Sequence, residues 1–550
     1  MASPYSISTL PTHEVANQPP LLGDIDLFAG DLPLQEALSR YGAAWARPEI
    51  HAFGRIMGRA ETYALADAAN RHKPELAAFD RYGRRIDEVS FHPAYHELMR
   101  LAAAHGIPSI AWAAKEPGGH VAHVALEYLF GQVEGGVCCP MTMTYAAVPV
   151  IRRNPPIAGE WEQKLLARAY DPRLLPVAEK TAATMGMAMT EKQGGSDVRS
   201  NTTRATSAGD GWFVLKGHKW FCSAPMSDAF LTLAQTDDGL SCFFVPRILP
   251  DGARNPFFIQ RLKDKLGNCS NASSEIEYDG TLGLPVGEPG RGVKTILEMV
   301  HHTRLDASMA PVALMRQALL QAMHHARHRI AFQRRLIDQP LMRAVLADLA
   351  IEWEAAMALL FRVAHAYDQS AASEDAARFA RIGVALAKFW LNKLAANYVY
   401  EAMECLGGIG YVEESILARL YREAPVNSIW EGSGNVICLD ILRAAEREAG
   451  ALDAVLAEIS AARGSDARFD QASESLRQAW RDKTGSEQRA RSLAERTAQL
   501  LQASLLLRHA PSAVADAFIA TRIAGDHGRT YGTLPLGVDV EAILNRAWPE

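Results

Sequence analysis

Cysteine is scarce in this chain, with 7 residues among 550. No C-x-x-C pair occurs, so neither a disulfide scaffold nor a zinc site is expected, and the reducing cytoplasm is the predicted location. No run of 18 apolar residues is uninterrupted, so no membrane span is predicted. Basic residues are not in excess either, because 57 Lys and Arg stand against 63 Asp and Glu, for a formal net charge of -6. Any contact with nucleic acid therefore requires a local basic patch.

Nucleotide-binding loops and metal motifs are also missing. Residues 287–292 have the wrong glycine spacing for a dinucleotide loop, and we interpret them as a turn before a helix. His324 and His328 form an i, i+4 pair, but no third ligand accompanies them, so no metal is predicted. The first twenty residues have neither a charged start nor an apolar centre, which indicates an extended arm instead of a signal peptide.

The spacing of apolar residues predicts an α+β chain of four segments. These are an N-terminal arm and helical domain (1–182), a small β domain (183–290), a helical bundle (291–447) and a C-terminal helical extension (448–550). Strands are expected at 212–217, 242–245 and 273–278, and long helices at 293–330, 341–367, 376–405 and 434–448. Because helices and strands are segregated along the chain, an alternating βαβ fold is excluded.

Two segments are polar and rich in glycine where a core would be apolar. In residues 187–197, Thr190 and Ser196 flank glycines, and such a loop either presents donors to an anion or heterocycle or is a plain surface loop. In residues 427–435, Glu431 lies between Trp430 and a Gly-Ser-Gly turn. An apolar neighbour raises the pKa of a carboxyl, as a general base near neutrality requires. The alternative for this segment is an exposed loop that caps a helix.

Four motifs give the chain a resemblance to the acyl-CoA dehydrogenase family of flavoproteins over residues 24–447. They are T-E-K-Q-G-G-S-D at 190–197, G-H-K-W-F-C-S at 217–223, L-G-G-I-G-Y at 406–411, and Y-R-E followed by I-W-E-G-S within 421–433. The resemblance implies the fold of that family, with a helical domain, a middle β-barrel or sandwich domain and a helical bundle. The C-terminal helical domain is then an addition.

The resemblance also implies FAD, held between the β domain and the helices that follow it. Glu431 is implied as the base that removes the α-proton of an acyl-CoA thioester. Residues implied for cofactor binding are Met187, Met189, Thr190, Gly194, Gly195, Ser196, Phe221, Cys222, Ser223, Gly408, Ile429, Trp430, Gly432, Ser433 and Asn435. Arg329 and Phe332 are implied to reach the cofactor of a neighbouring subunit, so a homo-oligomer, usually a tetramer, is expected.

Within the family, the chain most resembles the branch that acts in the adaptive response to DNA alkylation. This implies binding of double-stranded DNA by the C-terminal helices, through Arg443, Arg477, Arg481, Lys483, Arg489, Arg491 and Arg496. From residue 463 to 508, nine Lys and Arg stand against six Asp and Glu, a modest excess that also suits the solvated faces of helices. Cys269, Pro340 and Glu404 stand where relatives commonly have other residues, which leaves the acyl substrate open.

Three functions remain open at this point. The first is a flavoprotein that binds DNA and has weak dehydrogenase activity toward an isovaleryl-CoA-like substrate. The second is a metabolic dehydrogenase of short or branched acyl-CoA, without a DNA role. The third is a protein that shields DNA and keeps its flavin for structure alone.

Overall fold

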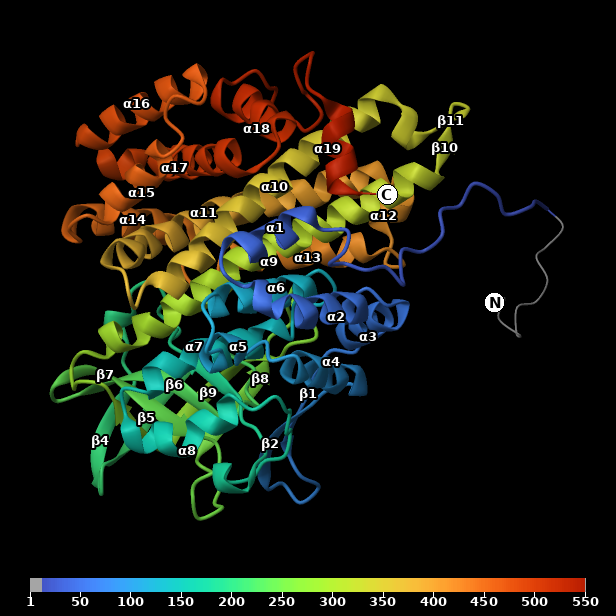
Figure 1. Cartoon of the computed structure of the whole chain (residues 1–550). Coiled ribbons are helices and arrows are strands. Elements are labelled where there is room, and N and C mark those ends of the chain that lie inside the picture. Colours follow the sequence, from blue (N-terminus) through green and yellow to red (C-terminus); the bar gives the residue numbers. More distant parts are fainter. Residues whose placement is uncertain (1–11, 550) are drawn as a thin grey trace.

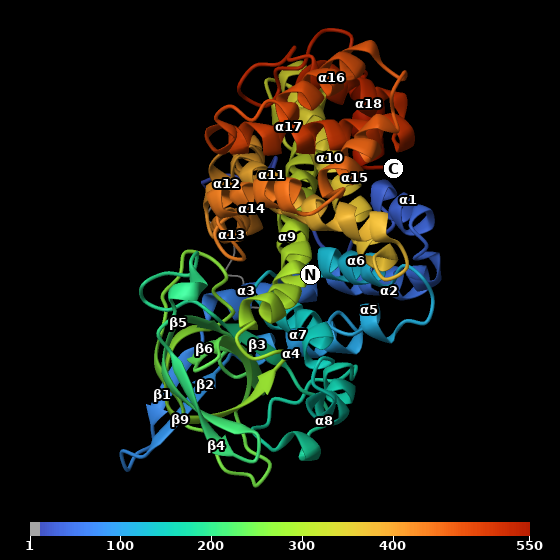
Figure 2. The same cartoon turned by 90° about the vertical axis from the view of Figure 1, so that its left-hand side faces the viewer.

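The computed structural model describes residues 12–549, so residues 1–11 of the expected N-terminal arm lie outside the described residues. Figures 1 and 2 show the β domain at one end of the molecule and the C-terminal helices at the opposite end, with long helices between them. This segregation of strands and helices confirms the predicted α+β class. None of the described helices is both long and apolar enough to cross a bilayer.

The N-terminal part is helical, with one hairpin that helical spacing did not predict. Its helices are α1 (Leu32–Arg40), α2 (Arg47–Met57), α3 (Ala60–Arg71), α4 (Pro93–Ala104), α5 (Ile110–Ala113), α6 (Gly119–Gly131), α7 (Cys138–Ile151) and α8 (Pro155–Leu165). Proline occupies the first turn of α1, α2, α4 and α8, where its missing N–H costs least. The hairpin pairs β1 (Glu75–Phe79) with β2 (Arg85–Ser90) in antiparallel fashion.

The middle domain is a closed barrel. Its strands are β3 (Met185–Ala188), β4 (Arg204–Gly209), β5 (Trp212–Ser223), β6 (Ala229–Thr236), β7 (Gly239–Pro246), β8 (Phe257–Leu262) and β9 (Ser273–Val286). The three predicted strands fall inside β5, β7 and β9. The path β6–β4–β5–β9–β7 returns to β6 through the β6–β7 pairing, so the sheet closes on itself.

The bundle is built on three long helices. Its elements are α9 (Gly292–His328), β10 (Ile330–Ala331), β11 (Arg334–Arg335), α10 (Pro340–Gln369), α11 (Glu374–Cys405), α12 (Gly408–Tyr411), α13 (Ile416–Asn427) and α14 (Gly434–Arg447). The turn at 287–292 lies directly before α9, as predicted. With 37 residues, α9 is about 55 Å long. It contacts α6, α7, α10 and α11, so it runs from the barrel through the centre of the bundle (Figure 2).

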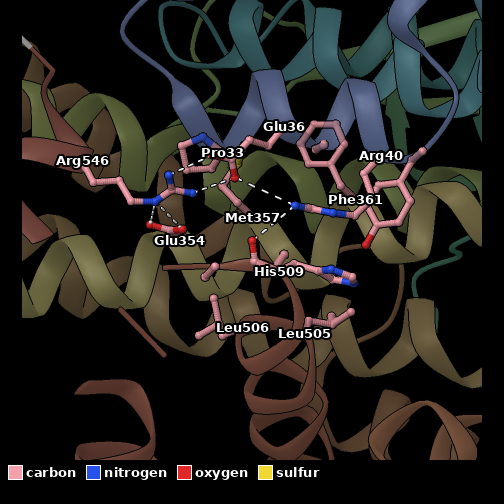
Figure 3. A pocket seen from close by; sticks show the side chains of 14 residues that line it. Pro33, Glu36, Arg40, Glu354, Met357, Phe361, Leu505, Leu506, His509 and Arg546 are labelled. Carbon is pink, nitrogen blue, oxygen red and sulfur yellow. Dashed lines mark hydrogen bonds and ion pairs between the residues drawn. The ribbon is translucent and has the colours of Figure 1, made fainter. Parts of the chain in front are cut away.

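The C-terminal helices cover the far side of the bundle. They are α15 (Ala451–Ser460), α16 (Ala467–Arg481), α17 (Ser486–His509), α18 (Ser512–Phe518) and α19 (Val540–Ala547). Arg546 of α19 pairs with Glu354 of α10 and with Glu36 of α1, at 2.8 Å each. Figure 3 shows these pairs beside a cavity of about 30 Å³, room for about one water molecule. The ion pairs join the C-terminal domain to both helical domains.

Candidate active site

Glu431 lies in the turn between α13 and α14. The backbone φ is +56° at Glu431 and +104° at Gly432, so the chain passes through the left-handed region twice. Thr303 Oγ1 donates a hydrogen bond to the Glu431 carboxylate at 2.5 Å, and Arg304 Nε donates to the Glu431 carbonyl oxygen at 3.1 Å. Lys388 Nζ donates to the carbonyl oxygen of Gly432. Side chains from α9 and α11 therefore hold both the carboxyl and the backbone of this turn.

The charges around Glu431 oppose one another. Burial raises the pKa of its carboxyl, while the hydrogen bond from Thr303 and the charges of Arg304 and Lys388 lower it, and the net shift is upward. Arg304 is itself paired with Asp440 at 2.9 Å. A carboxyl with a raised pKa, held in one orientation, is suited to accept a proton from a carbon acid near neutral pH.

The polar loop after β3 is built on a buried ion pair. Glu191 is fully buried and accepts hydrogen bonds from the backbone N–H and hydroxyl groups of both Thr202 and Thr203. Lys219 of β5, also fully buried, contacts it at 2.9 Å. Although burial opposes ionisation, these partners lower the pKa of Glu191 to about 2. The loop is therefore held against the barrel by a carboxylate that stays charged.

Close backbone approach shapes the same loop. A Cβ on Gly195 would lie 2.4 Å from Thr190 Oγ1, so a side chain at this position would displace that of Thr190. Gly194 has a φ of +137°, and a Cβ added there would have no other atom within 4 Å. Ser196 is exposed. The loop thus offers backbone and hydroxyl groups to a ligand on its outer side.

The predicted flavin-facing strand presents alternate residues on two faces. Phe221 is 49% exposed and Ser223 is half-buried, whereas Cys222 between them is fully buried in the barrel core. Strand alternation turns the Cys222 thiol away from the face of Phe221 and Ser223, so only its backbone is available for the predicted contact. Lys263 Nζ lies 4.5 Å from the centre of the Phe221 ring, and Ser223 Oγ lies 3.1 Å from Ser273 Oγ.

Apolar packing brings the loop and the acid turn together. Met187, Met189 and Trp430 all pack against one buried cluster, which includes Cys139 and Met143 of α7. The two polar, glycine-rich segments of the sequence are far apart in the chain, and they nevertheless share one region of the molecule.

Several groups in this region lack partners. The indole N–H of Trp430 is buried and has no hydrogen-bond acceptor among the described residues. The Ile429 side chain is 66% exposed. Ser433 occupies the N-cap position of α14, yet its hydroxyl makes no capping hydrogen bond. An unpaired donor, an exposed aliphatic side chain and an uncommitted hydroxyl beside the base are features of a ligand site.

Three predicted cofactor residues do not join this region within one chain. Arg329 lies roughly 39 Å further along the α9 axis than Thr303. Phe332, in the turn between β10 and β11, has a φ of +51° and is 92% exposed. Gly408 follows α11, whose end is roughly 25 Å from Lys388 along the helix. These residues occupy the opposite end of the bundle from Glu431.

The residues predicted to bind DNA divide into two groups. Arg443, Arg481, Lys483 and Arg491 are exposed, whereas Arg477, Arg489 and Arg496 are half-buried. The half-buried three donate hydrogen bonds to Ser460 Oγ, the Asp482 carbonyl oxygen and Ser475 Oγ, respectively. Arg491 lies 3.4 Å from Asn435 Oδ1, so the exposed group extends toward the acid turn. Four of the seven predicted residues are thus exposed, and three are partly engaged within the domain.

A second carboxyl cluster lies in the core on α6 and α9. His123 Nδ1 is 2.7 Å from the Ile107 carbonyl oxygen, to which it donates, so Nε2 is left facing Asp306 Oδ1 at 3.0 Å and Glu127 Oε2 at 3.4 Å. Burial raises the pKa of Asp306 to about 8 and that of Glu127 well above its ordinary value. Ligand atoms of these three residues lie within 4.8 Å of one another, the spacing of a metal site. We interpret the cluster as carboxyls that share protons at neutral pH.

Apolar spacing did not reveal the groups that hold the base. Arg304 and Lys388 are 6% and 1% exposed, on helices whose spacing indicated only a core. A charged residue at a core-facing helical position was the available signal, because such a residue is buried only when it has a partner.

A closed barrel between two helical domains, with an acid turn and a glycine loop packed together at its edge, defines the acyl-CoA dehydrogenase class. Family models agree with this assignment segment by segment. Residues 17–172 match the adaptive response protein AidB N-terminal domain, residues 186–281 the acyl-CoA dehydrogenase middle domain, and residues 290–446 the acyl-CoA dehydrogenase C-terminal domain.

The chain is 48% identical to the putative acyl-CoA dehydrogenase AidB of Escherichia coli (strain K12) over 469 residues, which cover 85% of this chain and 86% of that protein. Among solved structures, Caenorhabditis elegans ACDH-11 in complex with C11-CoA is similar with a TM-score of 0.84 and 27% identity, over 99% of this chain and 93% of that one. The apo-form of Bd2924 is similar with a TM-score of 0.82 and 29% identity, over 90% of this chain and 100% of that one. The chain thus belongs to the acyl-CoA dehydrogenase family, as an AidB-like member, and is an FAD-dependent enzyme of that type.

Proposed function

We propose that this AidB-like protein removes the α-proton of an acyl-CoA thioester with Glu431. The observation that carries this proposal is the Glu431 turn itself, where a carboxyl of raised pKa is oriented by Thr303 and flanked by Trp430. Because the base acts only when ionised, the rate should rise as pH increases through that raised pKa.

The surrounding residues fit FAD. Thr190 and Ser196 offer hydroxyls, Phe221 offers an exposed aromatic face, and Trp430, whose indole N–H has no acceptor among the described residues, packs against the same cluster as Met187 and Met189. When bound, FAD supplies a two-electron acceptor beside the acyl group. The chain contributes placement, exclusion of water and the base.

An absorbance titration tests this part of the proposal. The purified full-length protein should show a flavin spectrum, and anaerobic isovaleryl-CoA should bleach it slowly. A panel of short, branched and long acyl-CoA then defines the substrate class. ACDH-11, which shares the fold, was solved with C11-CoA, and this favours including chains of that length. A yellow protein that no acyl-CoA bleaches would mean that the flavin is structural.

We further propose that the C-terminal helices bind double-stranded DNA in the adaptive response to alkylation. The exposed Arg443, Arg481, Lys483 and Arg491 support this, and Arg481 and Lys483 form no ion pair within the described residues. Seven free thiols suit the reducing cytoplasm where such a response takes place.

A salt titration of DNA binding tests the second part. In the full chain, Arg481→Glu with Lys483→Glu should weaken binding and flatten the slope of log affinity against log salt, by about 0.9 for each phosphate that the protein no longer neutralises. Arg81→Glu, an exposed arginine at the tip of the β1–β2 hairpin, is the matched control. Binding that does not respond to salt contradicts the proposal.

A metabolic dehydrogenase without a DNA role is the alternative, and one observation favours it. Arg477, Arg489 and Arg496 make their hydrogen bonds inside the domain, as residues with a structural role do. Equal affinity of the charge-reversed variant and the control for DNA would support this alternative.

We also propose a homotetramer in which Arg329, Phe332 and Gly408 serve the cofactor of a neighbouring subunit. Their position at the far end of the bundle from Glu431 supports this, since one chain alone cannot bring the two sets together. Phe332→Ser should lower both the oligomer mass in light scattering and the FAD content. A variant with wild-type mass and FAD content would contradict the assignment.

A further inference from the structure

Lys388 is a buried cation without a carboxylate partner. It lies on α11 and is 1% exposed. No Asp or Glu oxygen is within ion-pair distance of its ammonium in the described part of the chain, and its hydrogen bond goes to the carbonyl oxygen of Gly432. Burying an ammonium is costly, so this placement needs a compensating role.

The turn that Lys388 contacts is an unusual one. Glu431 is a non-glycine residue with a φ of +56°, a conformation that such residues seldom adopt. That geometry directs two successive carbonyl groups toward two cations, Glu431 to Arg304 and Gly432 to Lys388. The hydrogen bonds from Arg304 and Lys388 thus stabilise the left-handed backbone conformation of Glu431, which is otherwise unfavourable.

We propose that Lys388 is a positioning residue for the base, and that its ammonium keeps the Glu431 carboxyl in line with the substrate only while it retains its proton. This inference rests on the proposed role of Glu431. It adds an alkaline limit to the reaction, set by a buried residue that contacts the backbone of the turn.

The charges that face Lys388 come from three elements. Arg304 of α9 and Lys393 of α11 lower the pKa of Lys388, and Glu431 of the turn raises it. Arg304 pairs with Asp440 of α14, which also binds Arg381 of α11. Desolvation is the largest influence, and the pKa of Lys388 is about 7. The ammonium is therefore charged below this pH and neutral above it.

These two titrations give the rate a bell-shaped dependence on pH. Glu431 must lose its proton to act, so the rate rises through its pKa on the acid side. Lys388 must keep its proton to hold the turn, so the rate falls on the alkaline side.

The test compares three variants of the FAD-loaded, full-length enzyme across the pH range with isovaleryl-CoA. Lys388→Arg should keep the rate and lose the alkaline fall, because a guanidinium does not release its proton there. Lys388→Met should lower kcat about 10- to 100-fold below the pKa of Lys388 with little change in KM, since misplacing the base costs that much, and the difference from wild type should shrink above that pKa. Lys393→Met is the control for kcat, because Lys393 contacts Ser428 Oγ and neither carbonyl of the turn; since its charge lowers the pKa of Lys388, its removal should move the alkaline fall to higher pH without lowering the maximal rate.

Hydrogen exchange of residues 428–434 gives a readout that does not depend on activity. Exchange should be faster in Lys388→Met than in Lys393→Met. If Lys388→Arg keeps the alkaline fall at the same pH, or if Lys388→Met has wild-type kcat and exchange, the inference is overturned. If Lys388→Met does not fold, Lys388→Arg decides alone. A fully active Glu431→Gln would instead refute the assignment of Glu431 as the base. Hydrogen exchange in Lys388→Met still tests whether Lys388 holds the turn, so failure of the base assignment is distinguished from failure of the Lys388 inference.

Discussion

Two carboxyl sites lie within one turn of each other on α9, and their neighbours differ in charge. At one site, Thr303 and Arg304 face Glu431 with a donor and a cation. At the other, Asp306 faces Glu127 and a histidine nitrogen, and no cation is present among the described neighbours. A donor and cations therefore favour the charged form of Glu431, whereas desolvation dominates at Asp306 and Glu127.

Glu191 is a third carboxyl whose neighbours set its pKa. It is as buried as Asp306, yet a lysine and four hydrogen bonds keep its pKa at about 2, compared with about 8 for Asp306. At Glu431 the partners offset only part of the desolvation, so the pKa of its carboxyl stays above its ordinary value. An intermediate environment is what a group that must both take and release a proton needs.

The strongest test of this comparison is Glu431→Gln. Removal of the base should lower the dehydrogenation rate about 10²–10⁴-fold while FAD remains bound. Stopped-flow flavin bleaching measures the rate, and Glu127→Gln, which removes a buried carboxyl from the other site, is the matched control. Unchanged bleaching in the glutamine variant at position 431 would show that burial and partners do not identify the base.

Lys219→Met should have the next largest effect. Loss of the ammonium leaves Glu191 charged and without its cation, which we expect to cost about 3–5 kcal/mol of unfolding free energy. Denaturant unfolding measures the change, and Lys216→Met, an exposed position on the same strand, is the control. If both variants are equally stable, the hydrogen bonds to Glu191 suffice without the lysine.

Asp306→Asn addresses the opposite end of the series. The native carboxyl keeps a proton up to a pKa of about 8, while the unfolded chain releases it at about pH 4. The native state binds more protons in this window, so the wild-type unfolding free energy should fall as pH rises, by at most about 1.4 kcal/mol per pH unit. The asparagine variant should lose this slope in unfolding titrations. Equal slopes would mean that Asp306 is already ionised.

Thr303→Val should have the smallest effect. Because the hydroxyl lowers the pKa of Glu431, its loss should move the acid limb of the rate profile upward by about 1–2 pH units. Thr295→Val, on the same helix but bonded to the Arg291 carbonyl oxygen, should leave the limb in place. An acid limb that stays in place in both variants would show that Thr303 does not tune the base.

Residues with unusual local composition were predictable from the sequence. Thr190, Ser196 and Glu431 stand in polar, glycine-rich segments, where the pattern departs from that of a core. The order of helices and strands followed from apolar spacing, because period and burial are linked in regular elements.

Residues whose role depends on distant partners were not predictable. Lys388 and Arg304 serve a turn that is far from them in the chain, and their own helices show only a core pattern. From the sequence alone Arg477 is interpreted as a basic surface residue, and only the structure shows its hydrogen bond to Ser460 Oγ. The inward direction of Cys222, in contrast, follows from strand alternation and was within reach of the sequence.

The continuity of α9 has a mechanical consequence. One unbroken rod carries Thr303 near the barrel and ends next to the hairpin that we propose enters a neighbouring subunit. Inserting a single residue between them would rotate one end by about 100° and shift it by about 1.5 Å against the other. The number of residues between Thr303 and the end of α9 therefore fixes how the two ends are oriented relative to each other. Insertions in the loops at either end do not change that orientation.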